Sequence, residues 1–449
     1  MRRRPVPNGQ LRLLLAEVGW TGQMVAGKVN ELGAEAGVSL SYQRASVTQW
    51  LSGVRPRLPV PELVAEALSR ALGRRVTVSE TGLGAPGGPE DEPRPGTWWT
   101  LDAATHLVNA CNTDGPTYST ASLSVPTWPA VTPLRVGTRP AARPATKVER
   151  ADVKSAAMML RLFSNADMTF GGGHARRALA GYLRSTITPW LRIDASPVVR
   201  RELLTTASRL SYLCGFMCFD DELHGAAQRH YLTSLRLAAE GGHAIGYAAA
   251  LRGLSVQAHL LGHHAQAVDL AEAAVQAASN RVATGPRAFL LGQLAVAHAA
   301  VGNRRDAIAN LGAAEAHLTR AEGGSSGVVA YHPASLAHQQ AATADCLGDR
   351  QGAVRALEVS VRCRPGNERR SRAITLARLA ELQLAGGRLE QACDTWQRFL
   401  DDYPLLRSRR VDTALATLRA RARAHQSHPA ARVLLRRAIQ LRTAGMRPT

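Results

Sequence analysis

"SVQAHLLGHHAQAVDLAEAA", residues 255–274, contains the pattern that decides the fold. Gly262 separates two stretches whose apolar residues recur with helical spacing, and Ala267 follows it by five positions. Glycine takes up the left-handed conformation that ends a helix, and a small alanine early in the next helix lets the two helices pack closely. The stretch therefore predicts a helical hairpin.

The same Gly-x4-Ala pattern recurs through the C-terminal part of the chain. After Gly262 it returns at Gly302, Gly348 and Gly387, at spacings of 40, 46 and 39 residues. An earlier copy has Glu222 in the glycine position, and Gly173 with Ala178 is a candidate sixth copy. Small residues also lie seven positions before each turn and seven after each alanine: Gly215, Ser255, Ala295, Ala341 and Ala380 before, and Ser234, Ala274, Ala314 and Ser360 after, with Phe399 the exception. Such repetition predicts an α-solenoid.

This set of offsets resembles the tetratricopeptide (TPR) repeat over about residues 160–405, with periods longer than the usual 34 residues. The resemblance implies a superhelix whose concave face is built by the first helix of each hairpin. It places these residues in the groove: Arg209, Tyr212, Phe216, Asp220, Arg252, Val256, His259, Phe289, His338, Asp345 and Glu381. Such a mixture suits a peptide or a small polar ligand, and a partly buried surface between repeats would have the same composition.

The N-terminal 82 residues predict four short helices. Asn8 and Thr21 are placed to cap the first two, and Gly19 ends the first. In "RASVTQWLSGVRPR", residues 44–57, Ser46 is the expected cap of a third helix that Gly53 stops. A fourth helix lies in "PVPELVAEALSRALG", between a proline-containing start and a terminal glycine.

This arrangement resembles the XRE (Cro/repressor-like) class of helix-turn-helix domain over about residues 8–82, although its second and third helices are joined by a longer connection than is usual there. In that class the third helix enters the major groove of DNA. We expect base reading by Gln43, Arg44, Thr48 and Gln49, and backbone contacts by Thr21, Gln23, Lys28, Arg55 and Arg57. The alternative is a helical bundle that caps the solenoid.

Charge and composition agree with a nucleic-acid partner but do not establish it. The net charge is +20, and both ends of the chain are basic, yet arginine so exceeds lysine that codon bias accounts for part of the excess. The chain has no long apolar run, so we expect a cytoplasmic, nucleoid-associated protein without a membrane segment. Residues 83–150 are read as a Pro/Gly-rich linker and irregular segment, and residues 151–449 as the solenoid with basic C-terminal helices.

We expect neither catalysis nor a cofactor. The paired residues Cys214 with Cys218, and His259 with His263, have helical metal-ligand spacing but no third ligand nearby in the sequence, so no metal site is predicted. The sequence shows no nucleophile-elbow motif and no paired catalytic carboxylates.

The whole arrangement resembles the actinomycete XRE–TPR transcriptional regulators, some of which restrain sporulation and antibiotic production. The stretches "LRLLLAEVGWTGQMVAGKVN" (11–30), "VTQWLSGVRPRLPVPELVAEALSRALGR" (47–74) and "FGGGHARRALAGYLRS" (170–185) carry this resemblance. It implies a sequence-specific regulator, a repressor rather than an activator, that binds double-stranded DNA as a homodimer. The TPR array would serve dimerisation or the sensing of a peptide, small molecule or protein. The alternative is a TPR adaptor that acts through protein contacts alone.

Overall fold

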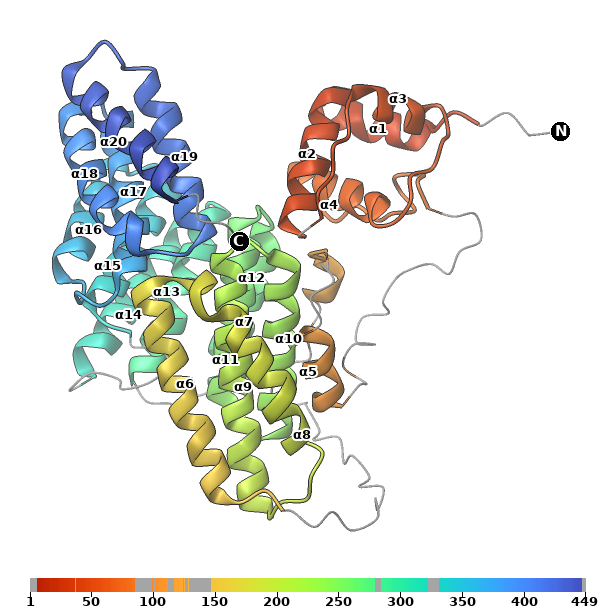
Figure 1. Cartoon of the computed structure of the whole chain (residues 1–449), viewed down its shortest axis with the longest axis vertical. Coiled ribbons are helices and arrows are strands. Elements are labelled where there is room, and N and C mark those ends of the chain that lie inside the picture. The colour runs from red at the N-terminus through yellow and green to blue at the C-terminus, as the bar shows by residue number, and fades with distance from the viewer. Residues whose placement is uncertain are drawn as a thin grey trace.

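The computed structural model describes residues 6–36, 38–84, 99, 102–111, 117–123, 125, 128, 147–278, 284–321 and 331–445. Over these residues the fold is all-α, with no strand (Figure 1). A small N-terminal helical domain precedes a solenoid of paired helices, as the sequence predicts. None of the described helices is both long enough and apolar enough to span a membrane.

The N-terminal domain consists of α1 (Gly9–Val18), α2 (Gly22–Glu35), α3 (Arg44–Leu51) and α4 (Val60–Leu72). The predicted caps of the first two helices are confirmed, since the Asn8 and Thr21 side chains accept hydrogen bonds from backbone N–H groups of the first turns. The predicted cap of α3 is wrong. Ser46 lies inside the helix, which begins two residues earlier with Gln43 at its N-cap position, because the Ser46 N–H already bonds to the Gln43 carbonyl at 2.9 Å.

A side-chain clamp holds the long connection between α2 and α3. The Asn30 side chain donates to the Tyr42 carbonyl and accepts from the Tyr42 N–H, both at 2.9 Å. The Tyr42 ring then packs edge-on against Trp50, with 5.2 Å between ring centroids. At the other end of α2, a Cβ on Gly22 would lie 3.6 Å from Val47, so α2 packs closely on α3. These contacts fix α3 relative to α2 despite the extra residues.

The solenoid is a series of antiparallel hairpins. The helices are α6 (Arg150–Phe170) and α7 (Gly172–Tyr182), followed by the π-helical turn η3 (Leu183–Ile187) and α8 (Thr188–Trp190); then the pairs α9 (Pro197–Asp220) and α10 (His224–Glu240), α11 (Ala244–Leu260) and α12 (His264–Ala277), α13 (Thr284–Ala300) and α14 (Arg304–Arg320), α15 (Pro333–Cys346) and α16 (Arg350–Cys363), α17 (Arg369–Ala385) and α18 (Leu389–Asp402) with the short η4 (Tyr403–Leu405), and α19 (Arg409–Arg423) and α20 (Pro429–Gly445).

The predicted hairpin turns are confirmed. Gly262, Gly302, Gly348 and Gly387 have φ angles of 85°, 78°, 80° and 76°. Glu222, which replaces glycine in the first of these turns, has a φ of 57° and is the one non-glycine residue with positive φ among those described. The small residues seven positions from the turns and alanines are buried where paired helices cross, and the Ser255 hydroxyl donates to the Ala267 carbonyl across one crossing.

The ends of the solenoid meet. In the α6–α7 turn the Gly173 N–H donates to the Arg407 carbonyl at 2.9 Å, and the Arg407 N–H donates to the Phe170 carbonyl at 2.6 Å. Gly171 has a φ of 88°, and a Cβ on it would lie 2.5 Å from the Arg407 carbonyl oxygen. The candidate sixth repeat is therefore a real hairpin, but its turn falls at Gly171 and not at the predicted Gly173, because the glycines there serve this close approach.

Part of the segment read as linker and irregular belongs to the solenoid core. The helix α5 (Ala103–Cys111) packs against α10, and the 3-10 turn η2 (Thr120–Leu123) follows it. Just before η2, the Ser119 backbone exchanges two hydrogen bonds with the Gln228 side chain, at 2.9 and 2.7 Å. Residues 85–98, most of the predicted linker, lie outside the described residues.

Candidate nucleic-acid interface and solenoid cavity

The α3 helix presents one polar face to solvent. Val47 and Trp50 are buried in the domain core, whereas the four predicted base-reading residues, Gln43, Arg44, Thr48 and Gln49, are all exposed. In Figure 1 this helix lies on the side of the N-terminal domain away from α10 and α12. The predicted reading surface is therefore contiguous and is not covered by the solenoid.

The predicted backbone-contacting residues are also exposed: Thr21, Gln23, Lys28, Arg55 and Arg57. The ion pairs within the described residues of this domain are Lys28–Glu31, Arg70–Glu35, Arg70–Glu66, Arg74–Glu17 and Arg74–Glu80. Among the described residues, therefore, no carboxylate neutralises Arg44, Arg55 or Arg57. These three positive charges remain available to a polyanion.

The opposite side of the domain contacts the solenoid through α4. Glu66 is buried, and its Oε1 lies 3.1 Å from His263 Nε2 in the α11–α12 turn. Arg70 bonds to Glu66 at 2.8 Å and to Glu35 at 2.9 Å, and it lies over the Tyr118 ring. Burial raises the pKa of Glu35, and the bonds from Arg70 oppose that rise. This polar contact joins the two parts of the molecule.

The first helices of the hairpins surround a cavity of about 330 Å³, a size within the range of small-molecule sites. Its walls come from α6, α9, α11, α13, α15, α17 and α19. The residues that line it are Ser164, Asp167, Met168, Tyr212, Leu213, Phe216, Phe219, Arg252, Val256, Phe289, Tyr331, Ser335, His338, Gln339, Arg364, Glu368, Arg370, Ser371, Ile374, Thr375 and Arg410.

The cavity brings together six of the predicted groove residues: Tyr212, Phe216, Arg252, Val256, Phe289 and His338. Asp220 lies behind its wall, 3.6 Å from Arg370. Arg209 is exposed, His259 packs against the His264 ring, and Asp345 and Glu381 both pair with Arg378, so none of these four lines the cavity. The positions predicted from the repeat therefore identify cavity residues mainly on α9, α11 and α13.

Sequence reasoning missed the ionic residues supplied by the two ends of the solenoid. Arg370 on α17 bonds to Asp167 on α6 at 3.0 Å and lies over the Phe216 ring at 4.5 Å. Arg410 comes from α19 and lies 4.9 Å from the Phe219 ring centroid. Asp167 lies six residues before Gly173, the same offset that Phe216 has from Glu222, so the repeat pattern could have found it. Arg370 and Arg410 do not lie at a groove position of the repeat, and no sequence signal pointed to them.

The cavity perturbs its titratable groups mainly by burial. Burial raises the pKa of Asp167 to about 6, although Arg370 opposes the rise. Burial also lowers the pKa of His338 to about 4, with Arg364 and Arg410 acting in the same direction. Loss of contact with water also lowers the pKa values of Arg252 and Arg410. His338 is therefore neutral near pH 7, whereas Asp167 is close to its titration range.

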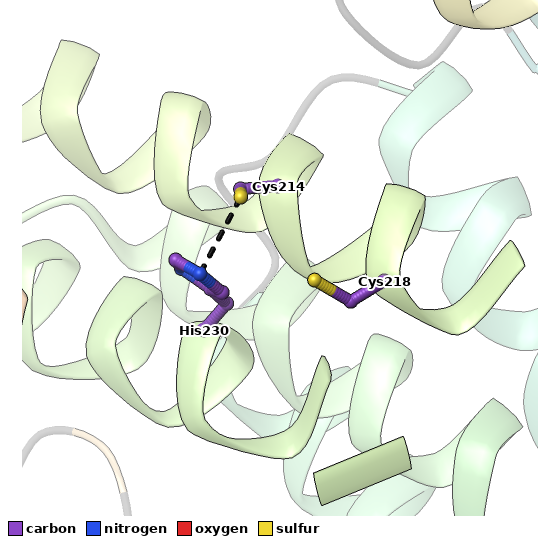
Figure 2. A group of neighbouring side chains, drawn as sticks. All are labelled: Cys214, Cys218 and His230. Carbon is purple, nitrogen blue, oxygen red and sulfur yellow. Dashed lines mark hydrogen bonds between the residues drawn. The ribbon is translucent and has the colours of Figure 1, made fainter. Parts of the chain in front are cut away.

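A second cluster lies inside the α9–α10 hairpin. Cys214 and Cys218 stand one turn apart on α9 and face His230 on α10 (Figure 2). Their two Sγ atoms and a His230 ring nitrogen lie within 4.8 Å of one another, and Cys214 Sγ is 3.4 Å from His230 Nε2. The sequence-based conclusion that the cysteine pair lacks a third ligand is wrong, because the hairpin turn brings His230 back to it.

Thiolate and imidazole ligands suit Zn²⁺ or Cu⁺. The cluster supplies three such groups, all buried, and His230 Nδ1 lies 3.4 Å from the Ser211 hydroxyl, which can hold the ring orientation. A hydrogen bond with Cys218 together with burial raises the pKa of Cys214. Without a metal, these three residues are buried members of the hairpin core.

Comparison with models of protein families shows a similarity in the N-terminal domain. Residues 11–84 match the family model described as the SP15 N-terminal domain. The match spans α1 to α4 and the segment that follows them, and it does not extend into the solenoid. No curated protein matches the chain significantly.

Proposed function

We propose that the chain is a sequence-specific DNA-binding transcriptional regulator, in which α3 reads the major groove. The observation that carries this proposal is the exposed polar face of α3, with Arg55 and Arg57 beyond its end and Val47 and Trp50 holding its other face in the core. Bases would be read by the α3 face, and the two later arginines would contact phosphates.

The regulator would act as a homodimer and as a repressor. A single helix-turn-helix domain buries too little surface for tight specific binding, whereas two domains on adjacent half-sites double it. The solenoid would supply dimer contacts or bind an effector, and the Glu66–His263 contact lies between these two parts of the molecule. The alternative remains an adaptor whose TPR-like array binds proteins and whose N-terminal domain never reads DNA.

Binding of the purified full-length chain to genome fragments at two salt concentrations tests the proposal. The comparison variant replaces Arg44, Thr48 and Gln49 with alanine. The matched control is Arg75→Ala. Like the triple variant, it removes one positive charge, but from an exposed residue that follows the C-terminal end of α4, the helix that carries Arg70. We expect a few fragments to be retained at the higher salt by the native chain and by the control, and lost by the triple variant.

Uniform retention that disappears with salt, and that the triple variant leaves unchanged, would overturn the proposal. The arginines would then bind phosphate without reading sequence. The adaptor alternative would take precedence in that case.

A further inference from the structure

The wall of the solenoid cavity carries more positive charge than negative charge. Four arginines line it, Arg252, Arg364, Arg370 and Arg410, against two carboxylates, Asp167 and Glu368. Asp220 behind the wall adds a third carboxylate. Arg364 pairs with Glu368 at 2.8 Å, and Arg370 takes both Asp167 and Asp220. The carboxylates are therefore already engaged.

Arg252 has no carboxylate within ion-pair distance among the described residues. Its Nε donates to the Phe289 carbonyl at 3.2 Å, and its guanidinium lies 3.6 Å from the centre of the Phe289 ring. These contacts orient the side chain toward the cavity but leave its charge uncompensated. Arg252 is half-buried, and partial removal from water without a counterion makes a cation destabilising.

Arg410, which α19 contributes to the cavity wall, is in the same situation. It lies over the Phe219 ring, and the two carboxylates that act on its charge are Asp220, which already contacts Arg370, and Glu222; neither forms an ion pair with it. Two guanidinium groups, each beside an aromatic ring and without an ion-pair partner among the described residues, thus line the same cavity. Guanidinium groups bind carboxylate, sulfonate and phosphate oxygens through paired N–H donors.

The remaining walls favour a flat apolar body. Tyr212, Phe216, Phe219, Phe289 and Tyr331 surround the arginines, and Val256, Leu213 and Ile374 fill the space between them. Aromatic side chains of this kind contact the faces and edges of planar ligands. A water-filled or purely ionic site would not need so much apolar wall.

We propose that this cavity binds a small organic anion with an aromatic body, whose acidic group pairs with Arg252 and Arg410. The proposal makes specific the effector role suggested above for the solenoid, and it does not depend on DNA reading. Inorganic anions would lack contacts with the aromatic walls, and neutral aromatic molecules would leave the two arginines unpaired.

The test uses two fluorescent probes with the same aromatic skeleton on the full chain. The first, 8-anilinonaphthalene-1-sulfonate, carries a sulfonate, and the second, N-phenyl-1-naphthylamine, is its uncharged counterpart. We expect the sulfonate probe to bind with one site per chain. We also expect the double variant Arg252→Met/Arg410→Met to weaken it by about tenfold or more, while the neutral probe is little affected.

The control is Arg409→Met, which removes an exposed arginine next to Arg410 and should leave the binding of both probes unchanged. Circular dichroism checks that the double variant is folded, and phenyl phosphate and inorganic phosphate serve as competitors of the sulfonate probe. Displacement by phenyl phosphate and not by inorganic phosphate supports the proposal.

Equal weakening of both probes, equal loss in the control, or displacement by inorganic phosphate alone would overturn it. If the double variant does not fold, two measurements on the native chain test the proposal instead. These are the competition with phenyl phosphate and inorganic phosphate, and the ratio of the affinities for the sulfonate and the neutral probe. These binding assays contain no DNA, so a negative result would not contradict the proposed reading of DNA by α3.

Discussion

The α3 surface and the solenoid cavity both gather arginines, but in opposite surroundings. Arg44, Arg55 and Arg57 are exposed and unpaired among the described residues, where water screens their charge at little cost. Arg252 and Arg410 are unpaired and half-buried in the cavity wall, where partial loss of water makes the same charge more costly. An exposed group of this kind suits an extended polyanion that can approach from solvent, whereas the half-buried pair requires a particular small partner.

We expect the largest difference in the free energy of unfolding when a buried ion pair of the cavity and an exposed ion pair of the N-terminal domain are each broken. Asp167→Ala leaves Arg370 with only the longer contact to Asp220, and we expect the free energy of unfolding to fall by about 3 kcal/mol. Glu17→Ala removes one partner of the exposed Arg74, and we expect no measurable change. Urea denaturation followed by circular dichroism measures both. Equal effects would remove the distinction between buried and exposed pairs.

Two arginines of the N-terminal domain should differ in their effects on DNA binding. Arg44→Ala should cost about 1–3 kcal/mol at a cognate site and relax sequence preference, because it removes a base contact. Arg57→Ala should weaken binding to every sequence and reduce the slope of log K against log salt by about 1. Titrations of cognate and random duplexes at several salt concentrations separate these outcomes. Equal loss on both duplexes for Arg44→Ala would contradict its assigned role.

Removal of an unpaired charge should affect stability only in the cavity. Arg410→Met replaces a half-buried guanidinium with an apolar side chain of similar length, and we expect the unliganded chain to gain about 1–2 kcal/mol. Arg44→Met on the exposed face should be neutral. Thermal denaturation without ligand compares the two variants. A large loss of stability in Arg410→Met would show that the guanidinium already has sufficient partners.

The smallest expected effect is that of pH on the cavity. Asp167 has a pKa raised to about 6 by burial, and the charged groups that act on it are Arg370, Asp220 and Asp221. Protonation below pH 6 removes one negative charge, so the affinity for the sulfonate probe should rise by about threefold between pH 7.5 and 5.5. His338, with a pKa of about 4, stays neutral over this range. Asp167→Asn should bind equally at both pH values, and a persistent rise would assign the effect to another group.

The sequence predicted what depends on local backbone geometry. A left-handed residue is required at each hairpin turn, so the glycines marked the turns, and even Glu222 was found by its place in the repeat. The caps of α1 and α2 were equally local. The N-cap of α3 was misplaced by three residues, because a helix can begin without a side-chain cap when the preceding carbonyl is already bonded.

Contacts between distant parts of the chain could not be predicted in this way. Asp167 and Arg370 are separated by 203 residues, and Glu66 and His263 by 197. The repeat pattern gives the order of the hairpins but not the total curvature that makes the last hairpins return to the first. The three consecutive glycines at 171–173 indicate that something packs closely against this turn. Nothing in the sequence identifies the Arg407 backbone as the group that does so.

The backbone bonds that join Arg407 to the α6–α7 turn change how such an array can behave. In an open array each repeat touches only its neighbours, so terminal units fray and units can be gained or lost with little effect on the rest. Here the turn before α19 is bonded to the α6–α7 turn, so the start of α19 and the end of α6 support each other across the array. Hydrogen exchange should therefore be as slow at these two helix ends as in the middle hairpins, and an extra repeat inserted between them would break the contact.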